Sequence, residues 1–169
     1  MTADRNPFSN HDSDRYALWD MLVRRDIEAF IAQDWSMVEQ DFVAEGFIGI
    51  DAHRSDNPDS WRLGYPALEH YRRSWLAQSH EFMRRQAGRD PKEALYRATI
   101  LRDIEIEGDT AVAHKKFDGH IPVVEGEPIE LRFQTLYYCR KIGEAWKAIG
   151  FLGYLPNPMG QQPPRAQNF

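Results

Sequence analysis

The chain contains few of the features that mark secreted, membrane or zinc-binding proteins. Among its 169 residues there is a single cysteine, so neither an internal disulfide nor a cysteine-based zinc cage can form. No apolar run approaches the roughly 18 to 20 residues that a membrane-spanning helix needs. Residues 1–14 are too polar for a secretory signal peptide. We therefore expect a cytoplasmic protein with no membrane partner.

Basic charge and phosphate-binding or metal-binding motifs are also lacking. The 21 lysines and arginines are outnumbered by 26 acidic residues, so the broad positive field that nucleic acid requires is absent, and we expect no nucleic-acid partner. The sequence has no GxGxxG, GK[ST] or HExxH motif. We expect no bound metal, although a site built from Asp51, His53 and His114 stays open. Cys139 falls among apolar neighbours and is expected to be a buried, inert thiol.

The composition is that of a folded protein with a substantial core. Hydrophobic residues make up 42% of the chain and aromatic residues 12%, which excludes a disordered protein. The length favours one domain over residues 1–169. We expect a core over about 14–155, a loose N-terminal arm over 1–11 and a proline-rich tail over 156–169.

The hydrophobic periodicity changes once along the chain. A repeat of three to four residues predicts helices over 14–33, 36–42 and 66–87, whereas a repeat of two predicts strands in the second half. The predicted strands are 47–53, 94–107, 110–118, 128–142 and 145–155, with a loop from 54 to 64. This order is typical of an α+β fold in which three N-terminal helices pack on a curved antiparallel sheet and leave a cavity.

Three stretches carry a resemblance to a known family. They are DIEAFIAQDWSMVEQDFVAEGFIGIDAH (26–53), YPALEHYRRSW (65–75) and AWKAIGFLGYLP (145–156). Over residues 14–155 the chain resembles the nuclear transport factor 2-like (SnoaL-like, cystatin-like fold) superfamily. The resemblance implies a cone-shaped fold with an internal cavity and no need for a cofactor. It leaves the reaction open, because isomerases, dehydratases, polyketide cyclases and proteins without any reaction share this shape.

Three residues are candidates for proton transfer. Asp26 lies at the edge of the apolar helix stripe, where its carboxylate is expected to enter the cavity; alternatively it turns outward to pair with Arg25. The resemblance places it where ketosteroid isomerases carry a catalytic tyrosine. Asp51 and His53 are two residues apart on a predicted strand, which puts both on one face. The alternative is that Asp51 caps the following loop while His53 is partly exposed.

A second set of residues is expected to bind a flat, hydrophobic small molecule, with hydroxyl groups fixing its orientation. The alternative for each is ordinary core packing. The predicted binding residues are Trp19, Trp61, Tyr71, Trp75, His114, Phe133 and Tyr137.

The strand over 129–141 alternates between an apolar set of side chains and a mixed set. The mixed set contains Arg132, Gln134, Leu136 and Tyr138, and tyrosine and arginine are enriched at protein interfaces. We therefore predict a homodimer formed through this sheet face. Paired basic residues such as Lys115–Lys116 are interpreted as solvated surface.

Two functions remain in view. One is a small enzyme that performs proton-transfer chemistry, such as isomerisation, dehydration or cyclisation, on a hydrophobic substrate. The other is a non-catalytic module that binds a ligand or associates as a dimer.

Overall fold

The first long helix of the protein contains a wider turn at its centre. In a computed structural model, which describes residues 3–159, α1 (Ser13–Trp19) continues into the π-helical segment η1 (Asp20–Arg25) and then into α2 (Asp26–Ala32). The carboxylate of Asp12 caps the first turn by accepting from the backbone N–H of Arg15. The helix predicted over 14–33 is confirmed, but the π segment has a wider turn than an α-helix, which changes the faces of the residues beyond it.

The segment after this helix differs from the prediction. The helix expected over 36–42 is wrong: two short 3₁₀ turns, η2 (Trp35–Met37) and η3 (Glu39–Asp41), stand in its place. Val38, which lies between them, has φ −123° and ψ −1°, so the helical dihedrals are interrupted after one turn. A further 3₁₀ turn, η4 (Pro58–Ser60), follows later in the chain.

Two further helices complete the helical layer of the fold. The predicted helix over 66–87 is confirmed as α3 (Leu68–Gln86), which begins after Pro66 because Ala67 is still extended. The strand predicted to start at residue 94 is wrong in its first part, where α4 (Lys92–Ala98) forms instead. The sequence KEALYRA consists largely of good helix formers. Packing against the rest of the fold stabilises this helix by burying one of its sides.

The strands form one six-stranded sheet in the order β2-β1-β6-β5-β4-β3. Their bounds are β1 (Ile48–Asp51), β2 (Arg62–Tyr65), β3 (Thr99–Glu107), β4 (Thr110–Ile121), β5 (Ile129–Ile142) and β6 (Ala145–Leu155). The sheet is mixed and not purely antiparallel as predicted, because β1 runs parallel to β6. β2 occupies part of the predicted loop, and the predicted strand over 47–53 ends at Asp51.

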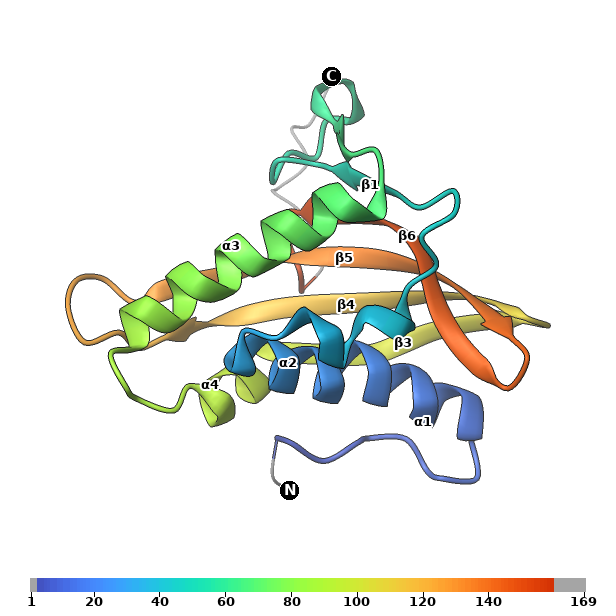
Figure 1. The fold of residues 1–169 in the computed structure, drawn as a ribbon, viewed down its shortest axis with the longest axis horizontal. Helices are drawn as coiled ribbons and strands as arrows, with labels where there is room; N and C mark the ends of the chain where they lie inside the picture. The colour runs from blue at the N-terminus through green and yellow to red at the C-terminus, as the bar shows by residue number, and fades with distance from the viewer. Residues whose placement is uncertain (1–2, 160–169) are drawn as a thin grey trace, which may run out of the picture.

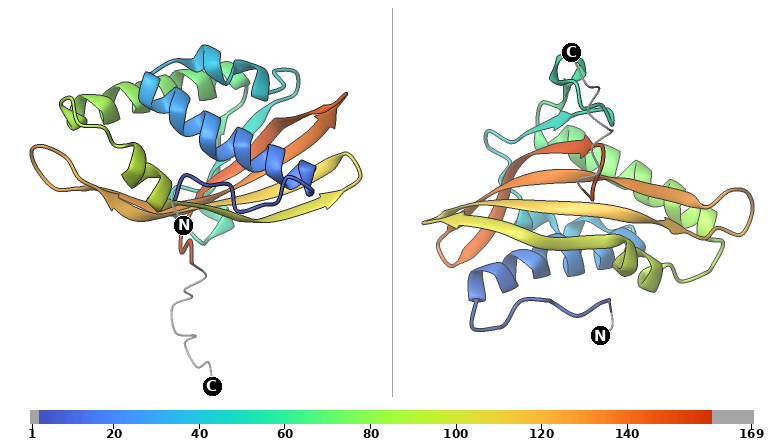
Figure 2. Two further views of the ribbon diagram at one scale, coloured as in Figure 1. Left: turned by 90° about the horizontal axis from the view of Figure 1, so that it is seen from below. Right: turned by 180° about the vertical axis from the view of Figure 1, so that it is seen from behind.

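All the helices lie on one face of this sheet, and the opposite face carries none in residues 3–159 (Figures 1 and 2). Register irregularities between β3 and β4 and between β5 and β6 are of the kind that increase strand bending. The sheet curves around the helices, which gives the expected α+β cone. Within the described residues, no helix combines the length and apolarity needed to cross a membrane.

Candidate functional site

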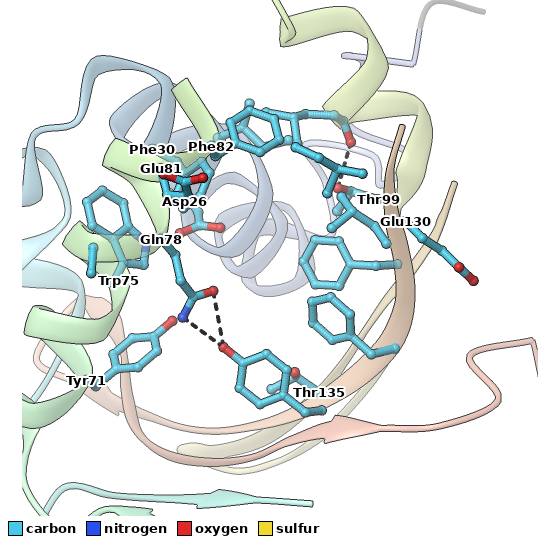
Figure 3. A pocket seen from close by; sticks show the side chains of 18 of the residues that line it. Asp26, Phe30, Tyr71, Trp75, Gln78, Glu81, Phe82, Thr99, Glu130 and Thr135 are labelled. Carbon is cyan, nitrogen blue, oxygen red and sulfur yellow. Dashed lines mark hydrogen bonds between the residues drawn. The ribbon is translucent and has the colours of Figure 1, made fainter. Parts of the chain in front are cut away.

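The concave face of the sheet and the helices enclose a cavity of about 540 Å³. α2, α3 and α4 contribute one side of its wall, and β4, β5 and β6 contribute the other (Figure 3). Most of the lining is apolar, which suits a small hydrophobic ligand. The apolar and aromatic lining residues include Ile27, Phe30, Phe82, Leu95, Phe117, Ile129, Leu131, Phe133 and Phe151.

Asp26 brings a carboxylate into this apolar wall. It is the first residue of α2, directly after the π segment. Its Oδ1 accepts from the indole Nε1 of Trp75 at 3.2 Å, and its Oδ2 accepts from Nζ of Lys115 at 2.8 Å. The alternative pairing with Arg25 is not adopted, because that guanidinium binds Asp41 and Asp20. Each carboxylate oxygen therefore keeps acceptor capacity for a ligand.

Lys115 was interpreted from the sequence as solvated surface, and that interpretation is wrong. Its side chain is 1% exposed and lies behind the carboxylate of Asp26, with Nζ 5.0 Å from the ring centroid of Phe117. Strand alternation explains the burial, since Ala111, Ala113, Lys115 and Phe117 share the inward face of β4. A lysine at an apolar position of this alternation is the sequence signal that indicates its burial, but it does not name the partner.

Two tyrosine hydroxyls lie close to the same carboxylate. Tyr71 and Tyr137 line the cavity, and both are buried. Burial raises the pKa of Tyr71 well above its ordinary value, with further contributions from Tyr137 and Asp26. Burial also raises the pKa of Tyr137, and the nearby charge of Asp26 adds to it. Both phenols therefore stay protonated. A hydrogen bond between the two side chains raises the pKa of Tyr71 and lowers that of Tyr137, as expected when Tyr71 donates to Tyr137. The O–H of Tyr137 can then donate to an oxygen atom of a ligand.

The mouth of the cavity opens into a shallower depression of about 340 Å³, which we term the vestibule. The vestibule is lined by Asp51, His53, Arg54, Tyr65, Gln78 and Tyr154. Arg54, Gln78 and Tyr154 line the cavity as well. The amide of Gln78 donates to the hydroxyl of Tyr154 at 3.2 Å. These three side chains therefore form the boundary between cavity and vestibule.

Comparisons with known proteins identify the fold. No protein-family model matches the chain, and no curated protein matches it significantly. Among solved structures, an NTF2-like protein of unknown function from Silicibacter pomeroyi matches with TM-score 0.53 and 14% identity, over 86% of this chain and 98% of that one. An NTF2-like protein with a cystatin-like fold from Novosphingobium aromaticivorans matches with TM-score 0.52 and 16% identity, over 86% and 84%. An NTF2-like protein of unknown function from Pseudomonas putida matches with TM-score 0.52 and 14% identity, over 91% and 92%.

The chain has the NTF2-like, cystatin-like fold. At these identities the likeness describes the shape of the backbone and carries no statement about chemistry. The chemical possibilities of this NTF2-like chain follow from its own side chains.

In this NTF2-like cone, Asp51 and His53 lie in the vestibule and not among the residues that line the cavity. β1 ends at Asp51, and His53 has a left-handed φ of 50°, so strand alternation does not apply to the pair. Asp51 Oδ1 accepts from the backbone N–H of His53 at 2.7 Å, and its Oδ2 lies 3.4 Å from Nδ1 of the same residue. Asp51 thus caps the loop, and His53 is exposed.

The predicted binding residues divide into two groups. The structure places Tyr71, Trp75, Phe133 and Tyr137 around the cavity together with Asp26. Their contact with a ligand stays a prediction, because core packing accounts for the same positions.

The other three predicted binding residues lie elsewhere. Trp19 stacks on Tyr96 beside the N-terminal arm, because the π segment separates its face from that of Asp26. The indole of Trp61 donates to the carbonyl of Ser55 within its own loop. His114 lies on the convex sheet face, where its ring is hydrogen-bonded to the side chain of Gln134.

The remaining titratable candidates do not form a site. Within residues 3–159, no cluster of three or more histidine, cysteine, aspartate or glutamate side chains is arranged to hold a metal ion. Cys139 is buried, and desolvation raises the pKa of its thiol to about 12. The thiol is therefore uncharged at neutral pH and is a poor nucleophile.

Proposed function

We propose that this protein binds a flat, hydrophobic small molecule in the cavity and transfers a proton to or from it through Asp26. The observation that carries the proposal is a carboxylate held by Trp75 and Lys115 in a mostly apolar wall. A base in such a position can abstract a proton from a carbon next to a carbonyl group. Isomerisation, dehydration and cyclisation all include a step of this kind.

The neighbouring groups fit the electronic needs of that step. Abstraction of the proton leaves negative charge on the substrate oxygen, which protonated hydroxyls stabilise by donating hydrogen bonds. Tyr137 supplies such a hydroxyl near Asp26, and the hydrogen bond that Tyr71 donates to Tyr137 strengthens it as a donor. When Asp26 accepts the proton, the positive charge of Lys115 loses its partner and favours the negative charge on the substrate. In the proposed step, protein side chains supply both the base and the groups that stabilise the charge on the substrate oxygen.

The test is proton exchange at a carbon acid. The probe is 2-tetralone, a flat ketone with acidic C–H bonds, incubated with the protein in D2O while NMR follows the loss of its proton signals. The wild-type protein is expected to accelerate the exchange, and Asp26→Asn is expected to slow it by about 100-fold or more, as is usual for loss of a general base. The matched control, Asp103→Asn, removes a carboxylate that pairs with the neighbouring lysine, Lys116, outside the cavity.

The competing function is a non-catalytic binding module. It predicts that 2-tetralone raises the melting temperature of the wild-type protein while exchange stays at the rate of buffer alone. Equal exchange in the wild-type and Asp26→Asn proteins would also reject the proposed role. If Asp51→Asn slowed the exchange and Asp26→Asn did not, the general base would be Asp51 in the vestibule.

A homodimer is proposed on the convex sheet face. Arg132, Gln134, Leu136 and Tyr138 point away from the helices on β5, and Tyr138 is 37% exposed. Val112, opposite Tyr138 on β4, adds a second exposed apolar side chain. No helix covers these strands in the described part of the chain (Figure 2). A second copy packed on this face would bury the apolar groups.

Light scattering during size-exclusion chromatography tests the dimer. Tyr138→Glu is expected to halve the molar mass, because it places a charge in the apolar centre of the contact. The control is Tyr16→Glu, which changes an exposed tyrosine on α1. A wild-type monomer, or equal masses for the wild-type and Tyr138→Glu proteins, would reject this interface.

A further inference from the structure

Three side chains with strained backbones meet at the mouth of the cavity. His53, Arg54 and Tyr154 have φ angles of 50°, 58° and 57°, a left-handed region that residues with a bulky Cβ substituent rarely adopt. The backbone N–H of Arg54 donates to the carbonyl of Tyr154 at 2.7 Å, which fixes two of them together. Strain of this kind concentrates where a fold needs a side chain in a particular place. Arg54 and Tyr154 line both the cavity and the vestibule.

The strained backbone presents the guanidinium of Arg54 at the mouth. Its carbon Cζ lies 5.7 Å from the ring centroid of Phe133, inside the range of a cation–π contact. Among residues 3–159, no carboxylate lies within ion-pair distance of Arg54. Asp51, the acid in the same vestibule, is engaged by the backbone and ring of His53. The donors of Arg54 are thus available to a ligand.

The other charged groups around the cavity have partners or point elsewhere. Glu81 forms an ion pair with Arg84 at 2.6 Å. Arg85 donates to the carbonyl of Glu127 at 3.0 Å. Glu130 points away from the centre of the cavity (Figure 3). The cavity lining therefore carries positive charge at Arg54 and at Arg85, and of these two only Arg54 also lines the vestibule. The far wall holds the Asp26–Lys115 pair, which carries no net charge.

We propose that Arg54 binds a carboxylate of the ligand, so that the ligands of this protein are hydrophobic carboxylic acids. The inference rests on the proposed function, which puts the apolar body of the ligand in the cavity between the aromatic side chains. A carboxylate at the far wall would face the negative charge of Asp26, whereas a carboxylate at the mouth gains a charge-assisted, two-pronged contact with the guanidinium. The acid group therefore points outward, and the reactive carbon points toward Asp26.

A matched pair of ligands tests this orientation by isothermal titration calorimetry. The probes are 2-naphthylacetic acid and 2-naphthylacetamide, which share a ring system and differ in charge. The wild-type protein is expected to bind the acid about tenfold more tightly than the amide at neutral pH. Arg54→Gln is expected to remove that preference, because it weakens binding of the acid much more than binding of the amide. Added salt should weaken binding of the acid alone.

Two further variants separate charge from structure. Arg54→Lys keeps the positive charge and is expected to retain part of the preference for the acid. Arg62→Gln changes an exposed arginine on β2 that lines neither the cavity nor the vestibule and should alter neither affinity. Circular dichroism checks that each variant is folded.

Several results would overturn the inference. Equal affinities of the wild-type protein for acid and amide would do so, as would absence of binding by both. An equal loss of both affinities in Arg54→Gln would assign Arg54 a packing role only. The proposed proton transfer fails separately, by absence of exchange with the neutral 2-tetralone. If the protein prefers the acid through Arg54 but does not accelerate proton exchange of 2-tetralone, the carboxylate site is retained and the catalytic step is rejected.

Discussion

Two adjacent lysines on β4 occupy opposite environments. Lys115 faces the helices, is 1% exposed and binds Asp26 at 2.8 Å. Lys116 faces the convex side, is 21% exposed and binds Asp103 at 3.0 Å. Asp26 is 29% exposed, whereas Asp103 is 65% exposed. The two pairs are the same in chemistry and nearly the same in length, so burial is what distinguishes them.

The comparison bears on the proposed role of the inner pair. An exposed ion pair adds little to stability, because water and salt screen it. A buried pair costs desolvation energy that its mutual attraction only partly returns, and an apolar pair of the same size often serves stability better. Retaining charges at Asp26 and Lys115, in the wall of a cavity, therefore favours a role in ligand chemistry.

The largest expected effect comes from removing the inner lysine. Lys115→Met leaves the carboxylate of Asp26 without its cation and is expected to lower the free energy of unfolding by about 3–5 kcal/mol. Urea denaturation followed by circular dichroism measures the change. The double variant Asp26→Leu/Lys115→Met removes both charges and should recover much of the loss. If the double variant is as unstable as the sum of its single changes, the two side chains do not act as a pair.

A smaller loss is expected when the inner carboxylate is neutralised without changing its shape. Asp26→Asn leaves an amide that can still accept one hydrogen bond, but it also leaves the buried ammonium of Lys115 without its anion. The free energy of unfolding should therefore fall by about 3 kcal/mol, the lower end of the cost of breaking a buried pair. The same denaturation experiment on Asp103→Asn supplies the comparison on the convex face. Equal effects of the two substitutions would contradict the distinction drawn from burial.

Removal of the outer lysine should have little effect. Lys116→Met breaks a mostly exposed pair with Asp103 and is expected to change the free energy of unfolding by no more than about 0.5 kcal/mol. Urea denaturation in low salt and in 1 M NaCl measures the pair with and without screening. A loss comparable to that of Lys115→Met would show that exposure does not separate the two lysines.

The smallest effect concerns the pH dependence of the outer pair. A hydrogen bond from Lys116 lowers the pKa of Asp103 below its ordinary value of 3.8. A carboxyl group with a lowered pKa stabilises the fold above its unfolded-state pKa and loses that contribution as the pH falls through its folded-state pKa. Because the group is mostly exposed, the contribution is a few tenths of a kcal/mol, roughly.

Asp103→Asn tests this dependence. The difference in unfolding free energy between the wild-type and variant proteins should be present at pH 6 and shrink below pH 3.8. Denaturation curves at a series of pH values measure it. A difference that grows as the pH falls would reverse the expected sign.

Regular alternation and helical repeats made much of the fold predictable. The buried face of β5, including Thr135, Tyr137 and Cys139, follows the alternation read from the sequence. α3 follows its helical repeat, with Tyr71 and Trp75 on the buried face. These patterns are local, because each residue's face depends on its neighbours along one strand or helix.

The errors occur where a non-local contact decides the local structure. The stretch 92–98 is an exception, because its residues are largely good helix formers and the predicted strand disregarded that local preference. The π segment cannot be read from the periodicity, and it separates Trp19 from the cavity that Asp26 enters. The parallel pairing of β1 with β6 joins segments about 100 residues apart, which no local pattern encodes.

The sequence by itself determined the class of fold and the inward face of β5, because the hydrophobic period records which side chains leave water. Only the tertiary structure decided that the carboxylate of Asp26 meets the ammonium of Lys115, 89 residues away, within an apolar wall. It also decided that Arg54 stands at the mouth. Such contacts depend on how separate elements pack, because the separation of two residues along the sequence does not determine their distance in the fold.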